Sequence, residues 1–246
     1  MKMTLFVRSI VDMNKNDHIQ AVVFDVDGTL FDTLPSLVAA ANDVLVQAGL
    51  REVPMALLRS ALSEGLRPMF RQALALQATA PHENLAAQLE EDYLVHYTQR
   101  WLAAAPLFAR ASETLATLKS QGLKLGICTN RDRRSTDALL ASTALAGRFD
   151  AIVGLGDAPL PKPAADPLLR VLQQMELPPS QVLFVGDSVM DARCAHAAQV
   201  RFAAHLAGYA GQPADLLPQV MGFEGYDQLT RWVLERLPAH KEACHA

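Results

Sequence analysis

A short buried strand followed by a long stretch without strand patterns constrains the fold of this chain most. Residues 20–25, Gln-Ala-Val-Val-Phe-Asp, are largely β-branched and aromatic and lead into acidic and glycine residues, which predicts a strand ending in a turn. Residues 34–105 are instead rich in Ala, Leu and Gln, which favour helices. The expected helices run from residue 34 to a stop at Gly49, and then near 55–63, 67–77 and 82–102.

From residue 106 onward, strand patterns alternate with helical ones. Short apolar runs predict buried strands at 123–128, 151–153, 181–185 and 200–204, and helices are expected near 113–120, 135–144, 165–176 and 189–198. Such alternation is typical of a Rossmann-like α/β fold, in which helices cover both faces of a parallel sheet. Because the helical stretch separates the first strand from the others, we interpret it as an all-helical cap domain inserted into the α/β core.

The expected organisation is a discontinuous core, an inserted cap and a short extension. The core comprises residues 18–33 and 106–240, and the helical cap comprises residues 34–105. Residues 1–17 carry little pattern, so we expect them to form an N-terminal extension outside the core.

Composition narrows the classes of function. The 246 residues contain 22 Lys and Arg against 26 Asp and Glu, a formal net charge of -4, so nucleic acid is not an expected partner. No stretch reaches the roughly 18 consecutive apolar residues of a membrane-spanning helix, so no membrane association is expected. Cys128, Cys194 and Cys244 are odd in number and scattered, which predicts no disulfide framework and a cytoplasmic location.

Polar side chains gather where the expected strands end. They are Asp25 and Asp27 after the first strand, Thr129 and Asn130 after the second, Lys162 after the third, and Asp187 and Asp191 after the fourth. Ligands of open α/β sheets bind at the carboxyl ends of the strands, so we expect one site. Clustered carboxylates repel one another unless a cation compensates them, and oxygen-only ligands favour Mg²⁺ over zinc. A lysine and two small hydrogen-bond donors nearby suit the oxygens of a phosphoryl group.

The order and spacing of these residues resemble the four motifs of the haloacid dehalogenase-like (HAD) hydrolase superfamily, in its branch with a helical cap after the first strand. Asp25-Val-Asp-Gly-Thr-Leu-Phe-Asp-Thr33 is similar to the first motif, Cys-Thr129-Asn130 to the second, Lys162-Pro163 to the third and Gly186-Asp187-Ser-Val-Met-Asp191 to the fourth. The resemblance spans nearly the whole chain, and the chain looks most like the phosphoglycolate phosphatases of that superfamily.

The resemblance implies chemistry for the acidic residues. Asp25 would be the nucleophile that forms an aspartyl-phosphate, and Asp27 would be the general acid and base, with a pKa raised by its acidic neighbours. Mg²⁺ would be held by the Asp25 carboxylate, the main-chain carbonyl of Asp27 and Asp187. Asp191 would support the waters of the metal or Lys162.

The resemblance also implies how the phosphoryl group is bound. Thr129 would donate its hydroxyl to a phosphoryl oxygen, and Asn130 would help to shape the same pocket. Lys162 would neutralise charge on both the nucleophile and the phosphate, so that positioning and electrostatics supply most of the rate.

Two arginines are candidates for substrate recognition outside the motifs. Arg67 ends a break between two cap helices, similar to the loop through which such caps reach the active site, with a surface arginine as the competing interpretation. Arg131 is close enough to the second motif to reach a substrate carboxylate, with a solvated helix face as the alternative. Gln199 departs from the family, because many relatives carry a glycine in the turn before the next strand.

The main functional hypothesis is a Mg²⁺-dependent phosphatase that hydrolyses a phosphate monoester of a small metabolite. Asp27 argues against dehalogenase chemistry, because a halide leaving group needs no proton and those relatives lack this acid. Residues 34–105 contain no Lys, which excludes the Schiff-base route of the related phosphonate hydrolases. A sugar phosphomutase of the β-phosphoglucomutase type and a non-catalytic phospho-ligand binding protein are the alternatives. The expected assembly is a monomer or a homodimer.

Overall fold

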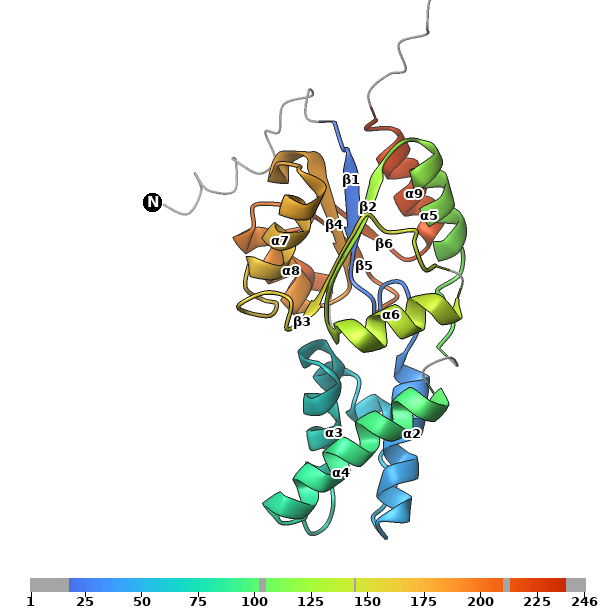
Figure 1. Ribbon diagram of the computed structural model, residues 1–246, viewed down its shortest axis with the longest axis vertical. Coiled ribbons are helices and arrows are strands. Elements are labelled where there is room, and N and C mark those ends of the chain that lie inside the picture. Colours follow the sequence, from blue (N-terminus) through green and yellow to red (C-terminus); the bar gives the residue numbers. More distant parts are fainter. Residues whose placement is uncertain (1–17, 102–104, 144, 210–212, 238–246) are drawn as a thin grey trace, which may run out of the picture.

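A parallel sheet forms the centre of the structure, a computed structural model that describes residues 18–101, 105–143, 145–209 and 213–237. Its six strands lie in the order β3-β2-β1-β4-β5-β6, and each neighbouring pair is parallel (Figure 1). The strands are β1 (Ala21–Phe24), β2 (Lys124–Asp132), β3 (Ala151–Leu155), β4 (Val182–Gly186), β5 (Arg201–His205) and β6 (Met221–Phe223). The α/β fold class expected from the sequence is therefore confirmed.

Alternating side chains of the central strand explain why helices cover both faces of the sheet. In β1, Val22 and Phe24 pack into one apolar cluster, whereas Ala21 and Val23 pack into a second. Successive residues of a strand point to opposite faces, so a strand buried on both sides is apolar throughout. The helices on the first face are α5 (Ala111–Ser120), α6 (Arg133–Ser142) and α9 (Tyr226–Leu234), and those on the second are α7 (Asp166–Met175) and α8 (Val189–Ala197) (Figure 1).

The helices between residues 34 and 101 lie beyond the carboxyl ends of the strands (Figure 1). They are α2 (Leu34–Gln47), α3 (Leu66–Ala75) and α4 (Glu83–His96), and a π-helical turn, η3 (Tyr97–Trp101), follows α4. Two backbone hydrogen bonds join the incoming and outgoing chain: Asp32 N–H donates to the Pro106 carbonyl at 2.9 Å, and Phe108 N–H donates to the Leu30 carbonyl at 3.0 Å. The two linkers to the helical cap therefore run side by side.

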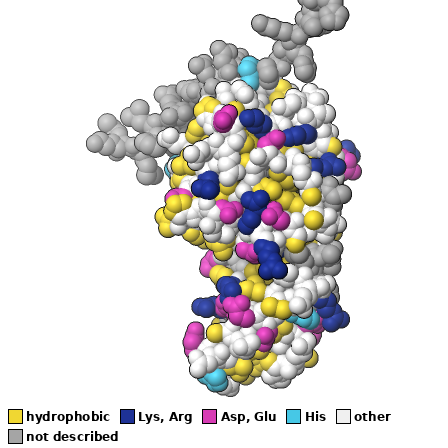
Figure 2. Space-filling view, in the orientation of Figure 1, with side chains coloured by type: hydrophobic (Ala, Val, Ile, Leu, Met, Phe, Trp, Pro, Cys, Tyr) yellow, Lys and Arg dark blue, Asp and Glu magenta, His cyan; other side chains and the backbone are white. Residues whose placement is uncertain are grey.

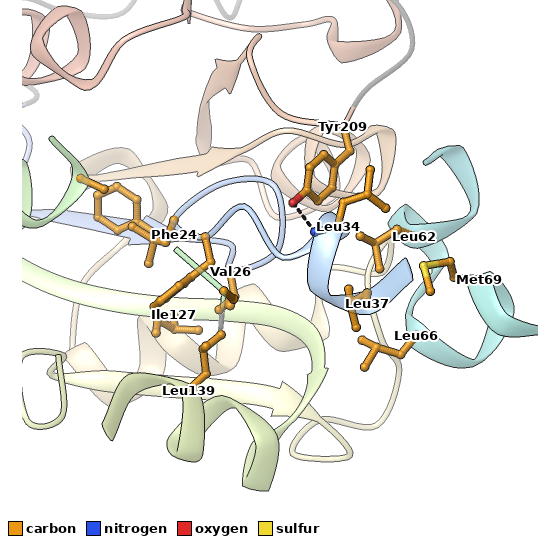
Figure 3. Close-up of a cluster of buried hydrophobic side chains, with 14 of the residues drawn as sticks. Phe24, Val26, Leu34, Leu37, Leu62, Leu66, Met69, Ile127, Leu139 and Tyr209 are labelled. Carbon is orange, nitrogen blue, oxygen red and sulfur yellow. Dashed lines mark hydrogen bonds between the residues drawn. The ribbon is translucent and has the colours of Figure 1, made fainter. Parts of the chain in front are cut away.

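One apolar cluster continues from the sheet into the cap. Its members in Figure 3 include Phe24, Val26, Ile127 and Leu139 on the sheet side and Leu34, Leu37, Leu62, Leu66 and Met69 on the cap side. Tyr209, from the loop after β5, packs here, and its hydroxyl accepts a hydrogen bond from Leu34 N–H at 2.8 Å. Buried apolar surface, as well as the two linkers, therefore attaches the cap to the core.

The segment between α2 and α3 differs from the helix expected over 55–63. It forms two short 3₁₀-helices instead, η1 (Met55–Leu57) and η2 (Ser60–Glu64). An isolated helix of this length has marginal stability in water, so tertiary contacts determine the backbone conformation of this segment. Leu58 and Leu62 are both buried in the cluster shared with the sheet, which accounts for the two tight turns.

Two elements, β6 and α9, are not among those expected from the sequence. The Met-Gly-Phe strand is too short to show a periodic pattern. The helix has a detectable signal, because Tyr226, Leu229 and Val233 are buried at helical spacing. The expected extension over residues 1–17 and the stretch after residue 237 lie outside the described residues.

Charged side chains of both signs are interspersed over the face shown in Figure 2, from the region of the sheet to the cap. This distribution agrees with the near balance of 22 basic and 26 acidic residues in the sequence. No helix in the described ranges combines the length and apolar character needed to cross a membrane.

The turn before β5 yields a prediction about stability. Gln199 is exposed and has φ of 56°, in the left-handed region that glycine adopts without steric cost. We expect Gln199→Gly to raise the free energy of unfolding by roughly 0.5–1 kcal/mol, since relief of strain exceeds the added chain entropy. The measurement is urea denaturation. Gln72→Gly, at an exposed position inside α3, is the matched control and should lower stability by about 1 kcal/mol. Equal losses in both variants would contradict the interpretation.

Candidate active site

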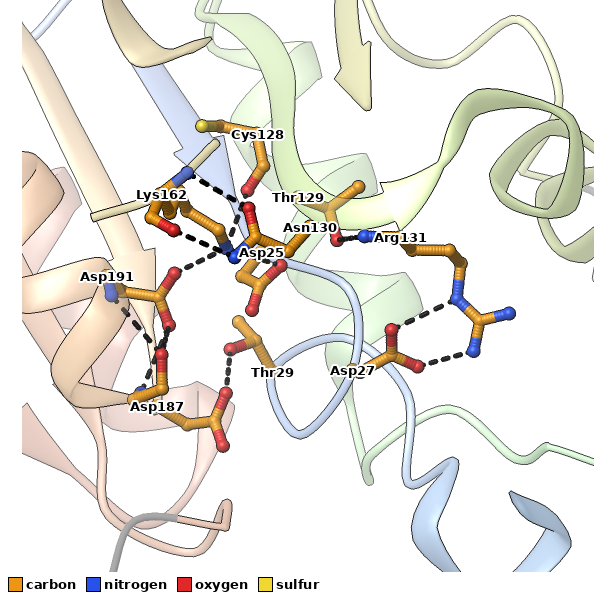
Figure 4. Close-up of polar contacts among 11 residues, drawn as sticks. Asp25, Asp27, Thr29, Cys128, Thr129, Asn130, Arg131, Lys162, Asp187 and Asp191 are labelled. Carbon is orange, nitrogen blue, oxygen red and sulfur yellow. Dashed lines mark hydrogen bonds and ion pairs between the residues drawn. The ribbon is translucent and has the colours of Figure 1, made fainter. Parts of the chain in front are cut away.

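The candidate site lies where β1, β2 and β4 end at the edge of the sheet that faces the cap. Asp25 directly follows β1, and its N–H donates to the Val185 carbonyl of β4 at 2.9 Å. Thr129 belongs to the last part of β2, and Asp187 directly follows β4. The parallel arrangement thus brings together side chains that are far apart in the sequence, as Figure 4 shows.

Three buried carboxylates form an acidic cluster. Asp25, Asp187 and Asp191 each place one oxygen within 4.8 Å of the others. Burial, reinforced by the charge of Asp191, raises the pKa of Asp25 to about 7, and the same causes raise the pKa of Asp187 well above its usual range. The cluster therefore repels itself when fully ionised, and a cation would relieve that repulsion.

Lys162 is the buried cation next to this cluster. Its Nζ lies 2.9 Å from Asp25 Oδ1 and donates to Asp191 Oδ1 at 2.5 Å and to the Cys128 carbonyl at 3.2 Å. Burial opposes its charge, but the charges of Asp191 and Asp25 outweigh burial and raise the pKa of Lys162 well above its usual range. Lys162 is thus a permanent positive charge beside Asp25.

Backbone and side-chain hydrogen bonds fix the position of Lys162. The Asn130 amide spans its main chain: Oδ1 accepts from Lys162 N–H at 3.0 Å, and Nδ2 donates to the Lys162 carbonyl at 3.1 Å. Asp191 is fixed as part of a capping box at the start of α8, where its Oδ2 accepts from the backbone N–H and hydroxyl of Ser188. Both oxygens of Asp191 are therefore already engaged within the protein.

The other two acids of the cluster keep capacity for a cation. Asp187 accepts one hydrogen bond on each oxygen, from the Thr29 hydroxyl at 2.8 Å and from Tyr209 N–H at 2.7 Å. Asp25 Oδ1 is buried and, despite the nearby ammonium, makes no hydrogen bond of acceptable geometry among the described residues. An all-oxygen donor set with unused lone pairs fits a hard divalent cation.

Asp27 lies apart from the acidic cluster and is paired with Arg131. The guanidinium donates through Nε to Asp27 Oδ2 at 3.0 Å and through Nη2 to Asp27 Oδ1 at 2.6 Å, as Figure 4 shows. Burial favours the neutral acid, but the charge and hydrogen bonds of Arg131 outweigh it and lower the pKa of Asp27. The expectation that acidic neighbours raise this pKa is therefore wrong, because the dominant neighbour is a cation that the spacing of acidic motifs does not reveal.

Arg131 lies buried near the end of β2. Its side chain is 0% exposed and belongs to β2, so the solvated helix face is wrong. It lines a small pocket together with Asp25, Asp27, Thr129 and Lys162. Its N–H donates to Thr129 Oγ1 at 3.2 Å, which leaves the Thr129 hydroxyl hydrogen free to point elsewhere.

The cap lines two neighbouring spaces. Leu62, Gly65 and Leu66 line the small pocket that contains Asp25 and Asp27, and a larger cleft of about 780 Å³ between cap and core shares Gly65 and Leu66 with it. Arg67 lines the larger cleft, but its guanidinium pairs within the cap with Glu90 at 2.5 Å and Glu91 at 2.8 Å. The break near residue 65 does reach the site, whereas substrate contact by Arg67 stays a prediction.

Sequence reasoning missed the loop after β5. Tyr209 N–H holds Asp187, and its hydroxyl donates to Asp32 Oδ1 at 2.8 Å beside the linker to the cap. The neighbouring Gly208 is required sterically, since a Cβ there would lie 2.3 Å from Asp187 Cβ and 2.5 Å from the Gly28 carbonyl oxygen. The sequence signal that could have revealed this loop was Gly208, a small residue shortly after the fifth strand and at the same end of the sheet as the motifs.

The acidic cluster predicts how Mg²⁺ affects stability at different pH. The pKa values of Asp25 and Asp187 are higher in the fold than the value near 4 of an unfolded chain, so the metal-free fold loses stability as pH rises from about 4 to above 7. A bound cation compensates the ionised acids. We therefore expect Mg²⁺ to raise Tm more at about pH 8 than at about pH 5.5, measured by calorimetry against a chelator control.

Two variants make this measurement specific. Asp187→Asn should remove most of the response to Mg²⁺, whereas Asp150→Asn, at a surface pair with Lys119, should leave it intact. An equal response at both pH values, or one that survives Asp187→Asn, would contradict a cation site in the cluster.

The sequence matches a protein-family model and the sequences of known proteins. The family model described as haloacid dehalogenase-like hydrolase matches residues 22–205. A phosphoglycolate phosphatase from Cereibacter sphaeroides is 32% identical over 208 residues, 85% of this chain and 94% of that protein. An N-acetylmuramic acid 6-phosphate phosphatase from Pseudomonas putida is 31% identical over 191 residues, 78% of this chain and 84% of that protein.

A solved structure extends the comparison to the fold. The crystal structure of a predicted phosphoglycolate phosphatase from Haemophilus somnus superposes with a TM-score of 0.82 at 24% identity, and covers 89% of this chain and 99% of that chain. The matched region includes both the sheet and the helices of the cap. The range of the family model likewise contains the acidic cluster, Lys162 and the Asp27–Arg131 pair.

Proposed function

This chain belongs to the haloacid dehalogenase-like hydrolase family, and we propose that it is a Mg²⁺-dependent phosphatase acting on a phosphate monoester of a small metabolite. Two observations support the proposal. The two relatives at 31–32% identity are named phosphoglycolate phosphatase and N-acetylmuramic acid 6-phosphate phosphatase. The buried Asp25 carboxylate lies 2.9 Å from the Lys162 ammonium at the end of the central strand, and this pairing carries the argument.

Asp25 is the proposed nucleophile. One of its oxygens would form a bond to phosphorus while the bond between phosphorus and the ester oxygen breaks, which gives an aspartyl-phosphate. The proximity of Lys162 supports this assignment, because the ammonium lowers the repulsion between an anionic carboxylate and an anionic phosphoryl group. Water would then attack phosphorus, release inorganic phosphate and regenerate Asp25.

Asp27 is the proposed acid and base. It would give a proton to the departing ester oxygen in the first step and take a proton from the attacking water in the second. In the described conformation its carboxylate is held by Arg131, so the acid step requires Asp27 to leave that guanidinium. The position of the Asp27 side chain in the reacting enzyme therefore differs from its position in this structure.

Thr129, Asn130 and Lys162 are the proposed phosphate contacts. Arg131 N–H binds an oxygen lone pair of Thr129, so the Thr129 hydroxyl hydrogen is available to a phosphoryl oxygen. Asn130 would act chiefly by clamping the main chain of Lys162. Lys162 would neutralise charge on both nucleophile and phosphate.

Asp25, Asp187 and the main-chain carbonyl of Asp27 are the proposed Mg²⁺ ligands. The unused oxygen lone pairs of the two carboxylates fit that cation. Because both oxygens of Asp191 are engaged, its proposed contribution is to orient Lys162 and to reach the metal through water. When bound, Mg²⁺ would supply positive charge that screens the phosphoryl oxygens from the carboxylates.

The cleft between cap and core is the proposed site of the leaving group. Its volume of about 780 Å³ and the lining residues that it shares with the small pocket at Asp25 support access for a small metabolite. Arg67 at its wall is the proposed cap contact, once it exchanges Glu90 or Glu91 for substrate. We also propose a cytoplasmic location, in keeping with two buried free cysteines, Cys128 and Cys194.

The proposal is tested by phosphate release from a panel of esters, including 2-phosphoglycolate, hexose phosphates and an aryl phosphate, with and without Mg²⁺. We expect Mg²⁺-dependent release that falls by at least about 1,000-fold in Asp25→Asn, because the variant removes the nucleophile. Asp150→Asn, which changes an exposed acid far from the site, serves as the control.

Three outcomes of this panel would contradict part of the proposal. Normal rates in Asp25→Asn would overturn the mechanism. Absence of release from every ester would overturn the phosphatase proposal and turn attention to hexose 1-phosphate isomerisation. Release without Mg²⁺ would overturn the metal assignment alone.

A further inference from the structure

The position of Asp27 poses a problem that the proposed phosphatase reaction has to solve. Figure 4 shows its carboxylate directed at the Arg131 guanidinium, while Asp25, Lys162 and Asp191 form a separate group. Both Asp27 oxygens are engaged by Arg131, at 3.0 and 2.6 Å. A carboxylate held by two charge-assisted hydrogen bonds is a poor proton donor, so some event has to displace it.

Arg131 has the properties of a group that binds more than Asp27. Its side chain is completely buried, yet its Nη1 has no hydrogen-bond partner among the described residues. The rest of the guanidinium is held firmly, because Nη2 also donates to the Tyr97 hydroxyl at 3.1 Å and Cζ lies 5.3 Å from the centre of the Tyr97 ring. A fixed guanidinium with a spare donor in a pocket wall is suited to recognise a second anion.

We propose that Arg131 is a substrate-recognition residue that exchanges Asp27 for a carboxylate on the leaving group of the substrate. This inference rests on the proposed phosphatase function. The substrate carboxylate takes the fork of Nε and Nη2 that Asp27 occupies. Asp27 is thereby released toward the ester oxygen, so that binding of the correct leaving group frees the acid that the reaction needs.

The geometry favours a carboxylate over other anions. The group to be replaced is itself a carboxylate, whose two oxygens lie in one plane and match the fork of a guanidinium. The catalytic pocket next to Arg131 is small compared with the 780 Å³ cleft, so it suits a compact anion close to the ester oxygen. The substrate class is therefore a phosphate ester whose alcohol carries a carboxylate on the ester carbon itself or on the carbon next to it.

The hydrogen bond between Arg131 and Tyr97 connects the proposed exchange with the cap. Tyr97 begins the π-helical turn that leads from the cap back to the core, and its hydroxyl accepts from Arg131. The guanidinium therefore keeps one partner during the exchange, which holds its plane in place for the incoming carboxylate. The same contact places substrate recognition at the junction between cap and core.

A binding experiment tests the exchange without turnover. Asp25→Asn removes the nucleophile but keeps the competition between Asp27 and the ligand, whereas Asp25→Asn/Asp27→Asn removes both. We expect calorimetric titration with 2-phosphoglycolate in the presence of Mg²⁺ to give at least about tenfold tighter binding to the double variant. Ethyl phosphate, which lacks the carboxylate, should bind the two proteins equally. An equal gain for both ligands, or no gain for either, would overturn the exchange.

A kinetic experiment tests Arg131 directly. For Arg131→Gln we expect the ratio of kcat/KM for 2-phosphoglycolate to that for ethyl phosphate to fall by about 100-fold, with partial recovery in Arg131→Lys. Arg133→Gln is the matched control, since Arg133 makes a surface pair with Asp137 at 2.9 Å, and its ratio should not change. A loss of structure would lower kcat/KM for both esters alike. The proposed effect lowers kcat/KM for 2-phosphoglycolate more than for ethyl phosphate.

The two proposals fail in distinguishable ways. If the wild-type enzyme hydrolyses both esters but Arg131→Gln leaves their ratio unchanged, the exchange is wrong and the phosphatase stands. If the wild-type enzyme hydrolyses no ester, the phosphatase is wrong, and the titrations with the two Asp25→Asn proteins still decide whether a carboxylate displaces Asp27.

Discussion

Close packing of buried acids around too few buried cations is the constraint on which this structure depends. Four carboxylates, those of Asp25, Asp27, Asp187 and Asp191, lie at the ends of the strands, and the buried cations in the described part of the chain are Lys162 and Arg131. Burial makes each unpaired charge costly, so the two cations have to be shared. Lys162 bridges Asp25 and Asp191, Arg131 neutralises Asp27, and Asp187 is left with hydrogen bonds from Thr29 and Tyr209. The carboxylates that remain uncompensated make the site suited to a cation. A cation bound there would in turn attract the anionic phosphoryl group.

The fold prepares this arrangement before any ligand binds. The Asn130 amide fixes the main chain of Lys162, and the capping box of α8 fixes Asp191. Tyr209 joins Asp187 to the linker of the cap through its N–H and hydroxyl groups. Such fixed dipoles and charges need little rearrangement during the reaction, which is the main way a protein accelerates phosphoryl transfer. The Asp27–Arg131 pair differs, because its geometry has to change before Asp27 can act.

The sequence was sufficient to predict the parallel sheet, the helical insertion and the gathering of the four motifs at one edge. Buried strands on both faces are apolar throughout, and the residues that follow them are confined to one edge by the topology. The same reasoning failed for η1 and η2, where burial of Leu58 and Leu62 decides the backbone. It also failed for the pKa of Asp27, because the partner of Asp27 is determined by side-chain direction at the end of β2 and not by spacing. Gly208 and Tyr209 were missed since they belong to a loop outside the motifs.

The central claim, that Asp25 carries the phosphoryl group, is tested most directly by trapping the intermediate in Asp27→Asn. An aryl phosphate has a leaving group that needs no proton, so this variant should still form the aspartyl-phosphate but hydrolyse it slowly. Acid quenching followed by peptide mass spectrometry should then find the added mass of one phosphoryl group on Asp25. A phosphoryl group on another residue, or release of phosphate without any protein adduct, would contradict the account.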